Sequence, residues 1–279
     1  MTSLSPGDPD NAYQLGIPYG PSILRPIELA TEQTMLDDLG SIKKSYEKLY
    51  DIQIDVDDRS VPTTGIYPTE FALEEDKLVL VFKKVVEEDY GPPIVVAEGQ
   101  SGYFVLDGHH RAYVRLKLSQ PYMKARVLVF PQERPFRERK SRRLGDMPVM
   151  KIGPIDDPTV ATWNQILTLL RYYERLYGIP FTLREAYLPL TQLVPTQTTV
   201  SLSRVRGVRT IKVPIACLET DDTYSILDGH ARAVAARKEG SPSIHSMILM
   251  ASRPTRFGIV ATAERIGLKT LEDIRITDP

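Results

Sequence analysis

The chain has 279 residues, of which 42% are hydrophobic and 25% are charged, and its 35 basic residues nearly balance 36 acidic ones. This composition is typical of a globular protein with enough apolar material for one large domain or two ordinary ones. The single cysteine excludes an internal disulfide, and the balanced charge gives no sign of a nucleic-acid or anionic-membrane surface. Because neither a signal peptide nor an apolar run of about 18 residues occurs, we expect a cytoplasmic protein that is not bound to a membrane.

The N-terminal half is predicted to contain an arm, two helices and several short strands. Residues 1–28 are rich in Pro and Gly and lack periodicity, which predicts an N-terminal arm. An amphipathic pattern predicts a helix from Glu32 to Tyr50. A loop, a second helix and three apolar strands are predicted to follow, at 61–65, 73–88, 94–96, 103–106 and 125–130.

A short motif lies between the second of these strands and another helical pattern. Residues 106–112 read Leu-Asp-Gly-His-His-Arg-Ala, so a carboxylate and a glycine turn come directly before a helix start that carries His and Arg. Unpaired backbone N–H groups and the positive end of the helix dipole gather at such a start, and the side chains add further donors. This combination favours phosphate binding.

The motif recurs 121 positions later, which indicates an internal duplication. Residues 227–233 read Leu-Asp-Gly-His-Ala-Arg-Ala, and three of the four histidines lie in the two copies. Further upstream, residues 173–177 repeat the pattern of 46–50 at an offset of 127. The offset therefore shortens by six across the 73–88 helix, whose counterpart should be short. We predict a first repeat at 29–157 and a second at 158–279.

Two substitutions distinguish the copies. Glu70 is replaced by Gln197, and His110 is replaced by Ala231. Gln keeps the shape of Glu but cannot accept a proton. We therefore expect one active site, in the first repeat, and a degenerate second repeat that is structural or closes over the substrate. The alternative is two sites of equal standing.

A strand, the D-G-H-H-R turn and a helix, with Pro68-Thr69-Glu70 upstream, resemble the ParB/sulfiredoxin-like superfamily. The resemblance covers about 66–130 and implies an α+β fold, internally duplicated, with small mixed sheets flanked by helices. Members of this superfamily hold nucleotide phosphates at the helix that follows the turn. Sulfiredoxin chemistry needs a cysteine where this chain has His109, and no helix-turn-helix pair of the chromosome-partitioning ParB proteins is evident.

The D-G-H-H-R form is most similar to the free L-serine kinases, which phosphorylate the amino acid with ADP or ATP. The resemblance implies a small-molecule kinase that converts a hydroxyl compound, L-serine first, into its phosphate ester. Glu70 would then accept the hydroxyl proton, and Asp107 would hold Mg²⁺ or orient the acceptor. Each carboxylate has a simpler alternative role, as a capping or turn residue.

Four residues of the motif are predicted to bind the nucleotide phosphates. Gly108 would let the backbone approach a phosphate closely, and His109, His110 and Arg111 would donate to its oxygens. The alternatives are a plain tight turn for the glycine and a packed core role for one of the histidines.

Three further expectations remain open. A non-catalytic nucleotide-binding regulator of the ParB type, responding to CTP or ATP, is the alternative function, and a DNA-associated factor is a third. The basic stretch 134–143 is expected to be a solvated face, although it could contact phosphate, and Trp163 is expected in the core. The sequence does not choose between ATP and ADP, because the motif would contact phosphates common to both.

Overall fold

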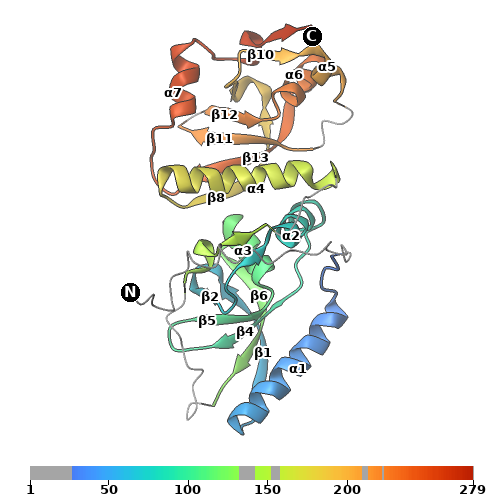
Figure 1. Ribbon diagram of the computed structural model, residues 1–279, viewed down its shortest axis with the longest axis vertical. Helices are drawn as coiled ribbons and strands as arrows, with labels where there is room; N and C mark the ends of the chain where they lie inside the picture. The colour runs from blue at the N-terminus through green and yellow to red at the C-terminus, as the bar shows by residue number, and fades with distance from the viewer. Residues whose placement is uncertain (1–26, 132–141, 152–157, 209–212, 222, 279) are drawn as a thin grey trace, which may run out of the picture.

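The computed structural model describes residues 27–131, 142–151, 158–208, 213–221 and 223–278 (Figure 1). Nearly all of the predicted N-terminal arm (1–28) and most of the basic stretch 134–143 lie outside the described residues. The two repeats lie one above the other in Figure 1, and a long helix of the second repeat runs between them.

The first repeat is built around a five-stranded mixed sheet. The strands follow the order β1-β6-β4-β5-β2, with β1–β6 and β4–β5 antiparallel and the other two pairs parallel. The helices and strands of this repeat are α1 (Glu32–Tyr50), β1 (Asp55–Pro62), β2 (Ile66–Pro68), β3 (Leu73–Glu74), α2 (Glu75–Glu88), β4 (Ile94–Glu98), β5 (Tyr103–Asp107), α3 (His109–Lys117), β6 (Tyr122–Val129) and β7 (Val149–Met150).

The second repeat has the same sheet topology. Its strands follow the order β8-β13-β11-β12-β9, with the same alternation of antiparallel and parallel pairs. Its helices and strands are α4 (Pro158–Tyr177), β8 (Phe181–Pro189), β9 (Leu193–Val194), β10 (Thr199–Ser201), α5 (Leu202–Arg206), β11 (Ile215–Thr220), β12 (Thr223–Asp228), α6 (His230–Lys238), β13 (Ser243–Ala251), α7 (Gly258–Arg265) and β14 (Arg275–Thr277).

Finer details also repeat, so the predicted fold class is confirmed as an internally duplicated α+β fold with small mixed sheets flanked by helices. An irregularity in register falls between Val95 and Val96 in β4, and at the same place, between Ala216 and Cys217, in β11. Each repeat also carries a two-stranded parallel pair, β3–β7 or β10–β14. As expected from the change of offset, α5 has only 5 residues where α2 has 14.

One sequence-based prediction is wrong. Residues 61–65 were expected to form a loop, but Val61 and Pro62 end strand β1, which pairs along its whole length with β6. Most side chains of β1 are exposed, and its sequence begins Asp-Val-Asp-Asp-Arg. An edge strand with so little apolar alternation gives no strand signal, and its position is fixed by backbone pairing with β6.

The long helix α4 joins the two repeats. Its Trp163 is 2% exposed, which confirms the expected core position, and stacks edge-on against Phe82 of α2 at 5.4 Å between ring centroids. Lys117 Nζ of α3 lies 2.5 Å from Glu174 Oε1 of α4, and Arg171 of α4 pairs with Glu75 of α2. The apolar cluster around Trp163 includes residues of both sheets, so the repeats share one core. None of the helices in the described ranges is long and apolar enough to cross a membrane.

Candidate functional site

The glycine of the motif is required by the backbone of the turn. Gly108 precedes α3 with φ of 95°, and a Cβ atom there would lie 2.7 Å from Cγ2 of Ile94. Gly229 has φ of 97° before α6, and its Cβ would lie 2.5 Å from Cγ2 of Ile215. An L side chain would be both strained and overpacked at either position. Because the residue before each helix is a glycine, no side chain at that position caps the first backbone N–H groups of the helix.

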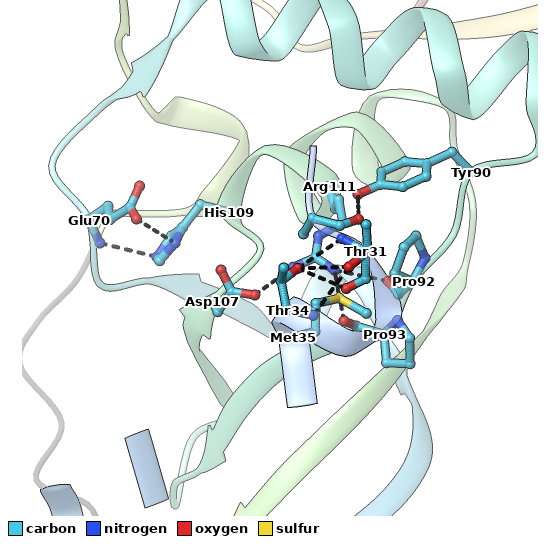
Figure 2. A network of polar contacts seen from close by, with 11 residues as sticks. Thr31, Thr34, Met35, Glu70, Tyr90, Pro92, Pro93, Asp107, His109 and Arg111 are labelled. Carbon is cyan, nitrogen blue, oxygen red and sulfur yellow. Dashed lines mark hydrogen bonds and ion pairs between the residues drawn. The ribbon is translucent and has the colours of Figure 1, made fainter. Parts of the chain in front are cut away.

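His109 ties this helix start to the segment that follows β2. Its Nε2 atom accepts the backbone N–H groups of Thr69, at 3.1 Å, and of Glu70, at 3.2 Å. A ring nitrogen that accepts carries no proton, so in the neutral ring the proton is on Nδ1. That atom lies 3.2 Å from Oε1 of Glu70, although the pair is not aligned as a good hydrogen bond. Figure 2 shows the contact.

Glu70 has an environment that keeps its carboxylate ionised. The contact with His109 holds the pKa of Glu70 below its usual range, against the opposing effect of partial burial. Its side chain is 53% exposed, whereas that of His109 is only 1% exposed. A buried histidine therefore holds the backbone of Glu70, while the carboxylate is reachable from outside.

The second histidine also accepts from the backbone. Nε2 of His110 accepts the N–H of Glu74, at 3.0 Å, just before α2. Burial, with a smaller contribution from Lys77, lowers the pKa of His110 to about 4, so the ring is neutral at neutral pH. The predicted role of both histidines therefore needs refinement. Their Nε2 atoms accept backbone N–H groups, so only the Nδ1–H groups are left to donate, and that of His109 faces Glu70.

Asp107 and Arg111 form an ion pair at the same turn. Nη2 of Arg111 donates to Oδ2 of Asp107 at 2.6 Å, and Nη1 donates to the carbonyl of Pro93 at 2.9 Å. Nη1 also lies 2.6 Å from the sulfur of Met35, in the first turn of α1 (Figure 2). Arg111 is only 6% exposed. Both of its terminal nitrogens are thus engaged by the protein, and a phosphate would have to share them.

The cavity at this site is small. It has a volume of about 40 Å³ and lies between the motif, Glu70, Lys77 and the chain at Leu29 and Ala30. The hydroxyl of Tyr90 donates to the carbonyl of Ala30 at 2.7 Å and holds that segment in place. Lys77 was missed by the sequence analysis. Its counterpart at an offset of 127 is Arg204, so a comparison of the two repeats would have found a cation kept at this position.

Asp107 is the carboxylate of the turn that could face a cation. Within the described ranges no group of three or more His, Cys, Asp or Glu side chains is arranged to hold a metal ion. Asp107 is one-third exposed, and among the described residues only its Oδ2 has a protein partner. Mg²⁺ is commonly held by one or two carboxylates together with substrate phosphates, and Asp107 fits that pattern.

The second repeat keeps the backbone contact of the histidine and the Asp–Arg pair, but it has no carboxylate at the position of Glu70. Nε2 of His230 accepts the N–H of Thr196 at 3.0 Å, and Nη2 of Arg232 donates to Oδ2 of Asp228 at 2.9 Å. Gln197 and Ala231 occupy the positions of Glu70 and His110. The cavity here is much larger, at about 630 Å³.

Comparisons with known proteins give a partial picture. No family model matches the chain. An uncharacterised protein of Methanocaldococcus jannaschii is 30% identical over 124 residues, which cover 42% of this chain and 46% of that protein. The match thus spans slightly under half of the relative's length.

Several solved structures share parts of the fold. Protein Atu1540 from Agrobacterium tumefaciens has a TM-score of 0.26 and 15% identity, over 29% of this chain and 44% of its own. Sulfiredoxin from Arabidopsis thaliana has a TM-score of 0.25 and 19% identity, over 28% and 90%. A free serine kinase variant in complex with AMP has a TM-score of 0.22 and 12% identity, over 81% and 86%. Similarities at this level carry no argument about activity.

Proposed function

We propose that the first repeat transfers the terminal phosphoryl group of ATP or ADP to the hydroxyl of a small molecule, with free L-serine as the first candidate and O-phospho-L-serine as its product. The observation that carries the proposal is an ionised, accessible carboxylate, Glu70, whose backbone is held by a buried histidine at an uncapped helix start. We also propose a cytoplasmic location for this reaction, as the sequence leads us to expect.

The phosphates would bind at the start of α3, next to the first turns of α1 and α2. Gly108 to Arg111 form the start of α3, Met35 lies in the first turn of α1, and Lys77 lies in the first turn of α2. Helix starts favour anions because their N–H groups and dipoles point toward the ligand. The cavity of about 40 Å³ offers the space of one or a few water molecules, so the nucleoside would lie outside it. Residues 29–35 would move to admit it.

The chain's own residues supply positioning and a proton acceptor. The acceptor's hydroxyl oxygen would attack the terminal phosphorus in line, forming one P–O bond. The P–O bond to the leaving nucleotide would break, and its electron pair would stay on the leaving phosphate. Glu70 would take the hydroxyl proton, while Nε2 of His109 holds the backbone of Glu70 in position. Gln197 cannot do this, so the second repeat would not transfer a phosphoryl group.

Asp107 is the residue that would hold a divalent cation. Its Oδ2 is held by Arg111, which fixes the direction of the carboxylate. A bound Mg²⁺ would supply charge neutralisation on the phosphates. Because one carboxylate provides few ligands, the phosphates themselves would complete the coordination.

An acceptor screen tests the proposal. The protein would be incubated with Mg²⁺, ATP or ADP and a panel of amino acids and polyols, and products would be read by ³¹P NMR. We expect O-phosphoserine from the wild-type protein. Glu70→Gln should reduce turnover by roughly 10²-fold or more while nucleotide binding is retained, because general-base catalysis contributes that much. Gln197→Ala, in the second repeat, is the matched control and should leave turnover unchanged.

Full turnover by Glu70→Gln would overturn the role of that carboxylate. The alternative function is a non-catalytic regulator that binds CTP or ATP, and the second repeat favours it by keeping the helix start and the Asp228–Arg232 pair without a proton acceptor. Nucleotide binding by calorimetry, with no acceptor-dependent turnover across the panel, would support the regulator.

A further inference from the structure

The second repeat contains the more open of the two motif cavities. The cavity of about 630 Å³ lies against the start of α6, at Asp228 to Arg232, and reaches Arg204 of α5 and Gln197. This volume falls within the range of about 300–1,000 Å³ typical of small-molecule sites. The equivalent space in the first repeat is about 40 Å³.

One substitution accounts for part of the difference in volume. Met35 contacts Arg111 in the first repeat and is 1% exposed, so its side chain fills the space over the arginine. The residue at the same position of α4 is Thr162, which lines the cavity of the second repeat. Thr162 of α4 therefore has a shorter side chain than Met35 of α1, which covers the motif of the first repeat.

The net charge of the residues that line the cavity also differs between the two repeats. In the first repeat two carboxylates, Glu70 and Asp107, balance the cations Lys77 and Arg111. In the second repeat, Gln197 removes one carboxylate while Arg204 and Arg232 keep both cations. Asp228 is then the only acidic side chain among the residues that line the described cavity. The lining has a net positive charge, which favours an anion.

Two side-chain donors in this lining have no acceptor among the described residues, and one of them is a buried atom. His230 is 3% exposed, and because its Nε2 accepts the N–H of Thr196, its Nδ1 carries a proton for which no acceptor is found in the described ranges. Nε of Arg232 is buried and likewise unpaired. A buried donor such as Nε of Arg232 normally has a partner, so this atom, with the His230 Nδ1–H beside it, indicates a ligand that supplies acceptor oxygens.

We propose that the cavity of the second repeat binds a phosphate-bearing anion and does not transfer its phosphoryl group. The uncapped start of α6, two arginines and the His230 Nδ1–H would contact the phosphate oxygens. The absence of a proton acceptor at Gln197 leaves the site without a general base. This proposal does not depend on catalysis in the first repeat.

Calorimetry with defined phosphate compounds tests the proposal. Sodium phosphate, sodium pyrophosphate and ATP would be titrated into the full chain at constant ionic strength. We expect binding of at least one of these probes that Arg204→Gln weakens by about tenfold or more, since one charge-assisted contact is worth that much. Arg204 is exposed, so this variant should fold, which circular dichroism would verify. Arg204→Lys should restore most of the affinity.

Three further variants separate this site from the first repeat. Thr162→Met and Gln197→Glu introduce the residues of the first repeat and should each weaken binding at the second. Lys77→Gln is the matched change in the first repeat and should leave this binding event unaltered. The inference is overturned if no probe binds, or if binding is insensitive to Arg204→Gln. Arg204-dependent binding without any kinase turnover would refute only the proposed function.

Discussion

At the scale of single residues, the histidines show what the sequence can and cannot reveal. Their position before a helix indicates a role near an anion, and the repeat of His109 as His230 marks a shared frame. Which ring nitrogen carries the proton depends on backbone N–H groups of Thr69 and Thr196, about 40 and 34 residues away along the chain. Such contacts follow from tertiary packing, so the sequence could not give them.

Burial of these rings makes the stability of the protein depend on pH. The pKa values of His110 and His230 lie at about 4, below the ordinary value of 6.5 expected in the unfolded chain, chiefly because both rings are buried. The unfolded state binds the proton more readily, so the full stability is present above pH 6.5 and is lost as pH falls toward 4. Each ring should account for roughly 3 kcal/mol of that loss.

Urea denaturation between pH 7 and pH 4 would measure this effect. His110→Ala is a suitable comparison, because the second repeat already has alanine at that position, as Ala231. The variant should lose less stability than the wild-type protein between pH 7 and pH 4, because one of the two titrating rings is absent. An equal pH dependence in the variant and the wild-type protein would show that His110 is not the titrating group.

At the scale of elements, the repeat comparison predicted more than local patterns did. The changing offset correctly indicated a short α5, and helix α1 was predicted with the bounds Glu32–Tyr50. Strands β1 and β8 were not predicted, although they occupy equivalent edges of the two sheets. Their place is set by pairing with β6 and β13, which lie about 60 residues further along the chain.

Helices α1 and α4 occupy equivalent positions in the two repeats but differ in what covers their outer faces. Leu36 and Trp163 occupy the same position, yet Leu36 is 43% exposed and Trp163 is 2% exposed against Phe82. Trp163→Ala should therefore lower the free energy of unfolding by about 3–5 kcal/mol, and Leu36→Ala by less than about 1 kcal/mol. Denaturation followed by far-ultraviolet circular dichroism would compare them, and equal losses would contradict the packing of α4 between the repeats.

At the scale of the whole molecule, the two repeats divide one ancestral site into two different environments. They share a core through α4, but the first has two carboxylates, two cations and a small cavity, while the second has one carboxylate, two cations and a larger cavity. The duplication and the substitution of Glu70 by Gln197 could be predicted from the sequence. The closure of the first cavity by Met35 and the 29–30 segment could not, because it depends on how α1 lies over α3.

The location of the reacting phosphate tests the central claim most directly. A crystal structure of the Glu70→Gln variant with Mg²⁺ and a non-hydrolysable ATP analogue would show it. The account predicts the terminal phosphate at the start of α3, against the backbone of Gly108 to Arg111 and within reach of residue 70. A terminal phosphate bound elsewhere, with residue 70 remote from it, would contradict the account.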